Sequence, residues 1–146
     1  MRQTAHRKHP ETFPVGFFLG LQARRFYHGD NKNPGHELHG TRRRGNLILR
    51  IAFEDLHHGH RKRIPPFFIF TKGAIGRDVI FRGLAVPGAI SIPQTEDLVA
   101  IWKTKSGQRF QNYRAIFTIL DVPRILRVWL NEIKTGNRLS EHAPEP

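Results

Sequence analysis

Residues 110–120, FQNYRAIFTIL, form the segment from which the predicted fold is built. They predict one long β-strand, because they are rich in aromatic and β-branched side chains and contain neither Gly nor Pro. A second strand is predicted at residues 97–103, DLVAIWK, and the turn at residues 105–108, KSGQ, separates the two. Two strands joined by a short turn that contains Gly indicate a β-hairpin.

Further strands are predicted on the N-terminal side of this hairpin. Residues 47–53 alternate as a half-buried strand does, and residues 67–70 resemble a strand that is buried on both faces. Residues 78–86 form another, in which Gly83 indicates a bulge or a close backbone approach. The short apolar run at residues 15–21 is a further candidate strand.

One amphipathic helix is predicted, at residues 122–135. Asp121 is the expected N-cap, Pro123 suits the first turn, and Gly136 suits the C-terminal cap. The fold class is therefore α+β and mainly β: a twisted, partly closed antiparallel sheet or barrel with the C-terminal helix packed on it. The apolar stripe of the helix is Ile125, Leu126, Trp129, Leu130 and Ile133.

The length of 146 residues and an apolar content of 38% suit a single domain with a buried core. We expect a basic disordered tail at residues 1–12, one domain at residues 13–138 and a loose tail at residues 139–146. There is no cysteine, which excludes disulfides, Cys-based zinc sites and a Cys nucleophile. No apolar run is long enough to span a bilayer, so we expect a cytoplasmic protein with no membrane partner.

Charge gives the first indication of function. The chain has 24 Lys and Arg against 12 Asp and Glu, a formal net charge of +12. Such an excess indicates an anionic partner, and nucleic acid comes first. Basic side chains in predicted loops and between strands would then hold the DNA backbone. Those selected are Arg42, Arg43, Arg44, Arg61, Lys62, Arg63, Arg77, Arg82, Lys103 and Arg114.

Two segments combine aromatic and amide side chains in a way that suits contact with a base. In residues 26–32, FYHGDNK, Tyr27 would stack on an extruded base and Asp30 would accept a hydrogen bond from its exocyclic amine. Asn31 is the third residue assigned to this pocket, where it could hold the sugar or phosphate. On the hairpin, Trp102 and Tyr113 are secondary candidates for stacking. The structural alternatives are an ordinary turn capped by Asp30 and two aromatics that belong to the core.

Other functions leave weaker signals. One alternative is a metal-dependent nuclease, whose carboxylates and lysine would be Asp121, Glu132 and Lys134. Glu132 and Lys134 fall in the predicted helix, however, where residues two apart do not share a face. An RNA-binding or assembly domain is the other alternative. Clustered histidines such as His57 and His58 suit exposed loops better than zinc, so we expect no metal and no cofactor.

The order of several segments along the chain resembles the N-terminal DNA-recognition domain of AspBHI-type, modification-dependent restriction endonucleases. The resemblance covers about residues 13–136, and residues 81–88 and 110–115 are its most specific parts. The segments that carry it are YHGDNK at 27–32, GNLIL at 45–49, PPFFIF at 65–70, GRDVIFRGLAVPG at 76–88, DLVAIW at 97–102 and RFQNYRA at 109–115.

This resemblance implies an SRA- or PUA-like curved sheet that grips modified duplex DNA. Such domains extrude 5-methylcytosine into an aromatic-lined pocket, and a separate C-terminal nuclease domain cuts the DNA. This chain ends at Pro146, so we expect the nuclease to be a domain or subunit outside it and the chain itself to be non-catalytic. No family motif transfers pocket residues, so the candidates above rest on their own chemistry.

Overall fold

The predicted hairpin is the centre of the structure. In the computed structural model, which describes residues 24–144, β4 is Leu98–Lys105 and β5 is Gln108–Ile119. Ser106 and Gly107 connect them with φ values of 51° and 75°. Two positive φ values are what a two-residue type I′ turn requires, so the predicted hairpin is confirmed.

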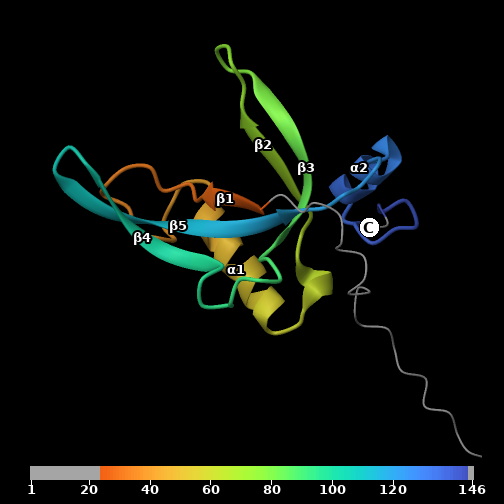
Figure 1. The fold of residues 1–146 in the computed structure, drawn as a ribbon, viewed down its shortest axis with the longest axis horizontal. Helices are drawn as coiled ribbons and strands as arrows, with labels where there is room; N and C mark the ends of the chain where they lie inside the picture. Colours follow the sequence, from red (N-terminus) through yellow and green to blue (C-terminus); the bar gives the residue numbers. More distant parts are fainter. Residues whose placement is uncertain (1–23, 145–146) are drawn as a thin grey trace, which may run out of the picture.

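Strand β5 organises the whole sheet (Figure 1). Strand β1, Arg24–His28, pairs with one edge of β5, while β4 and then β3, Val79–Pro87, follow each other along the opposite edge. Strand β2, Phe67–Lys72, pairs with β3. All pairs are antiparallel, which confirms the α+β, mainly β prediction, although across residues 24–144 the five strands form an open sheet rather than a closed barrel.

The predicted strand at residues 47–53 is wrong, because these residues lie within helix α1, Gly45–His57. Leu49, Ala52 and Phe53 are buried. Their spacing of three and four residues is the repeat of a helix face packed on a core. All but one residue of the segment are apolar, so a repeat of two and a helical repeat fit the sequence equally well.

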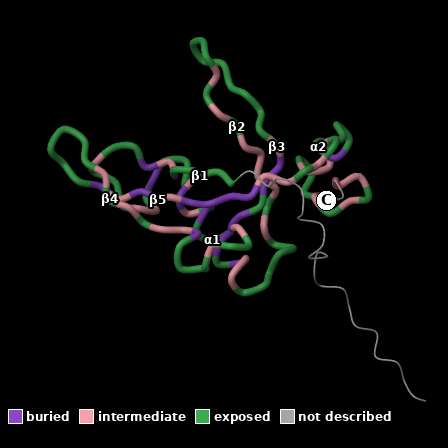
Figure 2. Tube along the Cα trace, in the orientation of Figure 1, coloured by how far each residue is buried: buried purple, intermediate pink, exposed green. Residues whose placement is uncertain are grey.

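Helix α1 covers one face of the sheet and forms the core with β5. Phe53 meets Phe117 edge to face, with ring centroids 5.7 Å apart. Figure 2 shows the buried residues following β5 and the facing side of α1. The buried cluster is Leu49, Phe53, Ala85, Tyr113, Ala115 and Phe117.

Strands β2 and β3 form a second hairpin that extends away from β4 and β5 (Figure 1). The predicted strands are confirmed, but β2 is not buried on both faces, since Phe70 is exposed. The role expected of Gly83 is confirmed. The register shifts beside it, and a Cβ there would lie 2.8 Å from Ile119 Cγ2.

Helix α2, Arg127–Lys134, is shorter than the predicted helix at residues 122–135. Asp121 is not its N-cap, and Pro123 lies before the helix. The residue before a proline is pushed out of the helical region, which blocks a helix start at residue 122. Trp129 is buried and packs against Phe68 of β2, with centroids 6.1 Å apart.

The C-terminal cap of α2 is confirmed. Gly136 has a φ of 89°, and its N–H donates to the carbonyl of Ile133. No helix within residues 24–144 has the length and apolar character needed to cross a membrane. The predicted tail at residues 1–12 and the predicted strand at residues 15–21 lie outside the described residues.

Candidate nucleic-acid interface

The motif at residues 29–31 forms a buried polar joint between β1, α1 and β5. Asp30 accepts hydrogen bonds from the backbone N–H groups of Gly45 and Asn46, at 3.0 and 2.9 Å, and from the Thr41 hydroxyl at 2.7 Å. Asn31 is 1% exposed, and its Nδ2 donates to the carbonyl of Gln111 at 2.8 Å. We call Gly29, Asp30, Asn31, Asn46 and Asn112 the β1–α1 joint.

The charge of Asp30 is held by these bonds. Burial favours the neutral acid, but the hydrogen bonds from Thr41, Gly45 and Asn46 outweigh it, so the pKa of Asp30 is lowered. The carboxylate therefore stabilises the N-terminus of α1, where free N–H groups favour negative charge. Both its oxygens are engaged inside the protein.

The two tyrosines predicted for the pocket have different surroundings. Tyr113 is 9% exposed within the core, and its hydroxyl lies 2.8 Å from Nε2 of His39. Burial raises the pKa of Tyr113. Tyr27 is 46% exposed and touches Phe117 with the ring edge, at a centroid distance of 6.2 Å. Tyr27 thus keeps a surface on which a base can stack, whereas Tyr113 offers little. For all five residues, a place in the pocket stays a prediction.

Basic side chains lie on the face of the sheet opposite α1. His28 of β1 pairs directly with Arg114 of β5, so the two side chains share a face. The guanidinium of Arg114 lies 5.8 Å from the ring centroid of Phe26. Burial, followed by the charges of Lys103 and Arg114, lowers the pKa of His28. We call Phe26, His28, Lys103 and Arg114 the open face.

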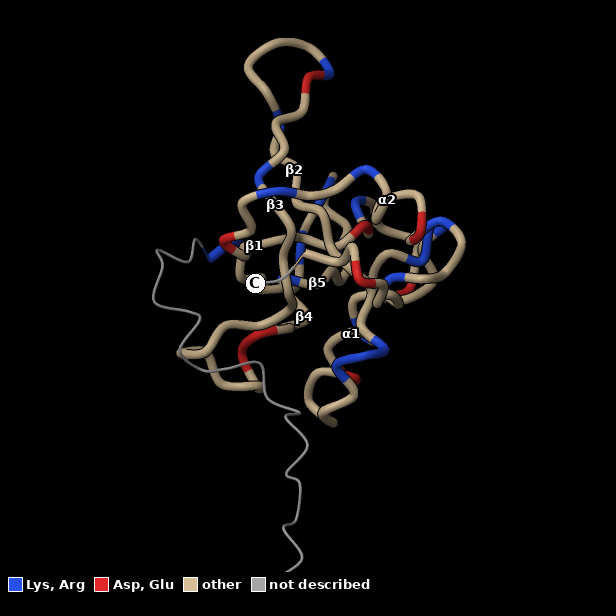
Figure 3. Tube along the Cα trace, turned by 90° about the vertical axis from the view of Figure 1, so that its right-hand side faces the viewer, with Lys and Arg blue, Asp and Glu red and all other residues tan. Residues whose placement is uncertain are grey.

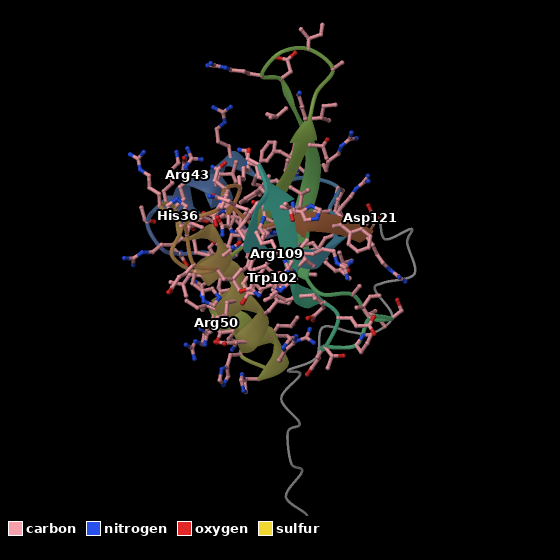
Figure 4. The ribbon with its side chains drawn as sticks, turned by 90° about the vertical axis from the view of Figure 1, so that its left-hand side faces the viewer. His36, Arg43, Arg50, Trp102, Arg109 and Asp121 are labelled. Atoms are coloured by element: carbon pink, nitrogen blue, oxygen red, sulfur yellow. The ribbon has the colours of Figure 1, made fainter. Side chains whose placement is uncertain are left out.

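The outer end of the β4–β5 hairpin, residues 102–111, carries an exposed aromatic side chain with a cation stacked on it (Figure 4). Trp102 is 57% exposed, and the Arg109 guanidinium lies 4.6 Å from its ring centroid. The hairpin end is tied to the loop after β1, since Lys105 Nζ donates to Asn33 Oδ1 at 2.5 Å. Residues 98–120 contain four Lys and Arg and no Asp or Glu, so this hairpin is suited to an anionic partner.

The other basic residues predicted to hold the DNA backbone occupy separate places (Figure 3). Residues 42–44 precede α1, whereas residues 61–63 form the short 3-10 helix η2 beyond its far end. The 13 residues of α1 separate the two clusters by about 20 Å. Arg77 and Arg82 belong to the β2–β3 hairpin, where Arg82 Nε donates to the Thr71 hydroxyl at 2.8 Å. The structure therefore brings Lys103 and Arg114 together and separates the rest.

The residues of the nuclease alternative are engaged elsewhere. The carboxylate of Glu132 in α2 bonds to the Ser140 hydroxyl and to His142 Nδ1. The bond from Ser140, followed by the contact with His142, lowers the pKa of Glu132. Within residues 24–144, no three His, Asp or Glu side chains lie close enough together to hold a metal ion.

His28 and Arg109 are among the members of this surface that were not selected from the sequence. Both lie in segments that also contain predicted site residues, but the neighbours of each follow from strand register. Pairing of His28 with Arg114 joins positions 86 residues apart. The position of Arg109 could have been found from the sequence, because a hairpin turn at residues 106–107 places Arg109 diagonally across from Trp102.

Comparison with known proteins gives a consistent result. The family described as "Restriction endonuclease AspBHI N-terminal" matches residues 22–146. The structure of the DNA modification-dependent restriction endonuclease AspBHI is 50% identical, with a TM-score of 0.76, and covers 84% of this chain. The DNA recognition domain of the cytosine modification-dependent restriction endonuclease LpnPI is 47% identical, with a TM-score of 0.69, over 76% of this chain.

The match covers 32% of the AspBHI chain and 51% of the LpnPI chain, so this chain corresponds to part of each. The curated proteins contain no match. The family match includes the whole of the described fold, and it confirms the resemblance seen in the sequence. The chain therefore belongs to the family of AspBHI-type restriction endonuclease N-terminal domains.

Proposed function

We propose that this chain is a specificity domain that binds duplex DNA containing a modified cytosine. The observation that carries the proposal is the 47% identity to the DNA recognition domain of LpnPI, a cytosine modification-dependent enzyme. A nuclease domain or subunit outside this chain would cut the DNA, as the partial coverage of AspBHI suggests.

The charges of the described residues support this proposal. The hairpin β4–β5 and the open face present Lys103, Lys105, Arg109 and Arg114 without a carboxylate in residues 98–120. Each phosphate that such cations neutralise releases counterions, which favours binding at low salt. Arg43, in the loop before α1, is a further candidate for a phosphate contact, whereas Arg50 of α1 is paired with Glu54.

The modified base is proposed to leave the helix stack and enter a pocket. Extrusion costs a few kcal/mol, which stacking and hydrogen bonds in the pocket offset. The methyl group itself adds about 1 kcal/mol through apolar contact, or about fivefold in affinity. Tyr27 and Trp102 are the candidates whose rings are exposed enough to stack on the base.

A gel-shift panel tests the proposal. Plain, 5-methylated, hydroxymethylated and phosphorothioated duplexes are titrated at two ionic strengths, with an RNA duplex as competitor. We expect binding that weakens steeply with salt and a severalfold preference for one of the modified cytosines. Negligible affinity for every DNA duplex at low salt, or equal affinity for plain and modified DNA, would overturn it.

Two variants separate pocket from backbone. Tyr27→Ala is expected to reduce the preference for modified DNA, because it removes the stacking surface. Arg43→Ala is expected to weaken plain and modified DNA alike, because a phosphate contact carries no information about the base. Equal losses on both duplexes for Tyr27→Ala would remove Tyr27 from the pocket.

A further inference from the structure

We propose that the end of the β4–β5 hairpin enters the major groove, where Arg109, held by Trp102, recognises a guanine near the modified cytosine. This inference rests on the proposed function and adds to it a residue that determines flanking sequence. It starts from an arrangement that the core does not require: an exposed Trp with an Arg stacked on it.

The hairpin end has the shape for a groove. Strand β1 pairs with residues 114–118 of β5, and β3 pairs with residues 117–119. Within the described part of the chain, residues 102–111 are therefore a ribbon of two strands without a third (Figure 1). The major groove of B-DNA admits a two-stranded β-ribbon, and Lys103 on β4 is available for a contact with a phosphate beside the groove.

Arg109 has the free donors that base recognition needs. Among the described residues it forms no ion pair with a carboxylate. Its guanidinium carbon lies 4.6 Å from the centroid of the Trp102 ring, and such a cation–π contact does not consume the N–H donors. Those donors match O6 and N7 of guanine, the commonest specific contact in the major groove.

Trp102 acts as a positioning residue. An arginine that is already stacked on a ring loses less rotamer freedom when it binds. The ribbon itself is also held in place, since Lys105 bonds to Asn33 and the buried Asn31 bonds to the carbonyl of Gln111. The Arg109 guanidinium is thus presented from a supported surface rather than from a free loop.

The experiment uses the full chain and a duplex that carries the preferred modified cytosine. Guanines flanking that base are replaced one at a time by 7-deazaguanine, which keeps base pairing and lacks the N7 acceptor. For the wild type, we expect about a tenfold loss of affinity at one position and little change at the others, because 7-deazaguanine keeps O6 but lacks N7, the second of the two acceptors that the guanidinium binds. Indifference to 7-deazaguanine at every position would overturn the inference.

Variants assign the contact. Arg109→Ala is expected to bind the guanine and 7-deazaguanine duplexes equally, because it has no donor for N7, whereas Arg109→Lys keeps the charge but lacks the planar fork and should show only part of the wild-type difference. Trp102→Ala should reduce the loss of affinity that 7-deazaguanine causes, which we call the 7-deazaguanine penalty. Trp102→Phe, which keeps an aromatic ring, should restore part of this penalty. Lys103→Ala, the control on the same strand, should weaken binding and keep the penalty.

The outcomes separate this inference from the proposed function. If Arg109→Ala still loses affinity when guanine is replaced by 7-deazaguanine, Arg109 does not contact N7. This result holds even if the variant binds all duplexes more weakly, because Arg109 would then contact only phosphate, and it would overturn this inference alone. Failure of the proposed function would instead appear as equal affinity of the wild type for plain and modified duplexes. Thermal unfolding of each variant verifies that the fold is retained.

Discussion

The turn at residues 29–31 and the hairpin end at residues 102–111 both contained side chains predicted to contact a base, and the structure places them in opposite environments. The turn is buried in the β1–α1 joint, with Asn31 1% exposed, whereas the hairpin leaves Trp102 57% exposed. Polar residues beside a glycine can thus serve the protein's own backbone, and an aromatic residue on a strand can remain available to a partner.

This contrast separates stability from binding. Changes in the joint should lower the free energy of unfolding, because its polar groups are buried and hydrogen-bonded. Changes at the hairpin end and on the open face should lower DNA affinity and leave the fold intact, since those side chains are partly or wholly exposed. Each variant below tests this separation.

The largest effect is expected for Gly29→Ala. A Cβ at this position would lie 1.6 Å from Asn46 Oδ1 and 2.6 Å from Asn112 Oδ1, both in buried side chains. The joint must then come apart, at a cost above about 4 kcal/mol, so we expect a chain that fails to fold. Urea unfolding followed by circular dichroism measures this.

Gly40→Ala is the matched control in the same loop. Its new Cβ would lie 3.6 Å from the nearest atom, an ordinary contact, and stability should change by less than about 0.5 kcal/mol. Native-like stability of Gly29→Ala would show that the joint does not hold β1 and α1 together.

A smaller loss of stability is expected for Asp30→Asn. The amide keeps one acceptor but loses the charge that interacts with the N-terminus of α1, at a cost of about 2 kcal/mol at pH 7. Urea unfolding measures this loss. Glu37→Gln, an exposed carboxylate in the same loop, should change stability little.

The pH dependence gives a second test of Asp30. Because its pKa is lower in the folded protein than in the unfolded chain, its contribution is complete above the unfolded value of about 3.9 and disappears as pH falls through the folded pKa. The wild type should therefore lose more stability than Asp30→Asn on acidification below about pH 4. Parallel losses would mean that the carboxylate is not stabilised by the fold.

For the hairpin, Lys103→Ala should weaken DNA binding and leave stability unchanged. Removal of one phosphate contact should lower affinity about equally for plain and modified duplexes and reduce the slope of log K against log salt by about one. Fluorescence anisotropy at four salt concentrations gives that slope. An unchanged slope would place Lys103 outside the interface, whatever its position on the open face.

Much of the sheet followed from the sequence because its signals are local. The β4–β5 hairpin follows from a segment rich in aromatic and β-branched residues, a neighbouring apolar segment and the short turn with Gly107 between them. Helix α1 was missed because residues 47–53 fit two periodicities. The start of the helix is determined by Asp30, which lies 15 residues before Gly45 in the chain.

The candidate site was harder to predict, because its residues are defined by contacts between positions far apart in the chain. Asp30 and Asn31 have the residue types of a recognition turn, and only their long-range bonds to Asn46 and Gln111 show that they are used internally. Lys103 and Arg114 were selected for their charge, but only strand pairing shows that Arg114 lies beside His28, whose pKa is lowered by burial and by both charges. Strand register therefore determines which basic residues lie on the same face of the sheet.

The smallest effect is expected from His28, and it tests that surface directly. Burial and the charges of Lys103 and Arg114 lower its pKa, so the free protein holds it neutral at pH 7. A phosphate bound over the open face would screen those charges and accept a hydrogen bond from the imidazolium, which raises the pKa of His28 in the complex. Binding then takes up a proton, and affinity should rise about threefold between pH 7.5 and pH 6.

Anisotropy titrations should show this rise for the wild type and for the exposed loop variant His36→Gln, but a weaker one for His28→Gln. An identical rise in His28→Gln would mean that the phosphate does not lie on the open face, and the DNA would then have to contact the hairpin from the side of Trp102 alone.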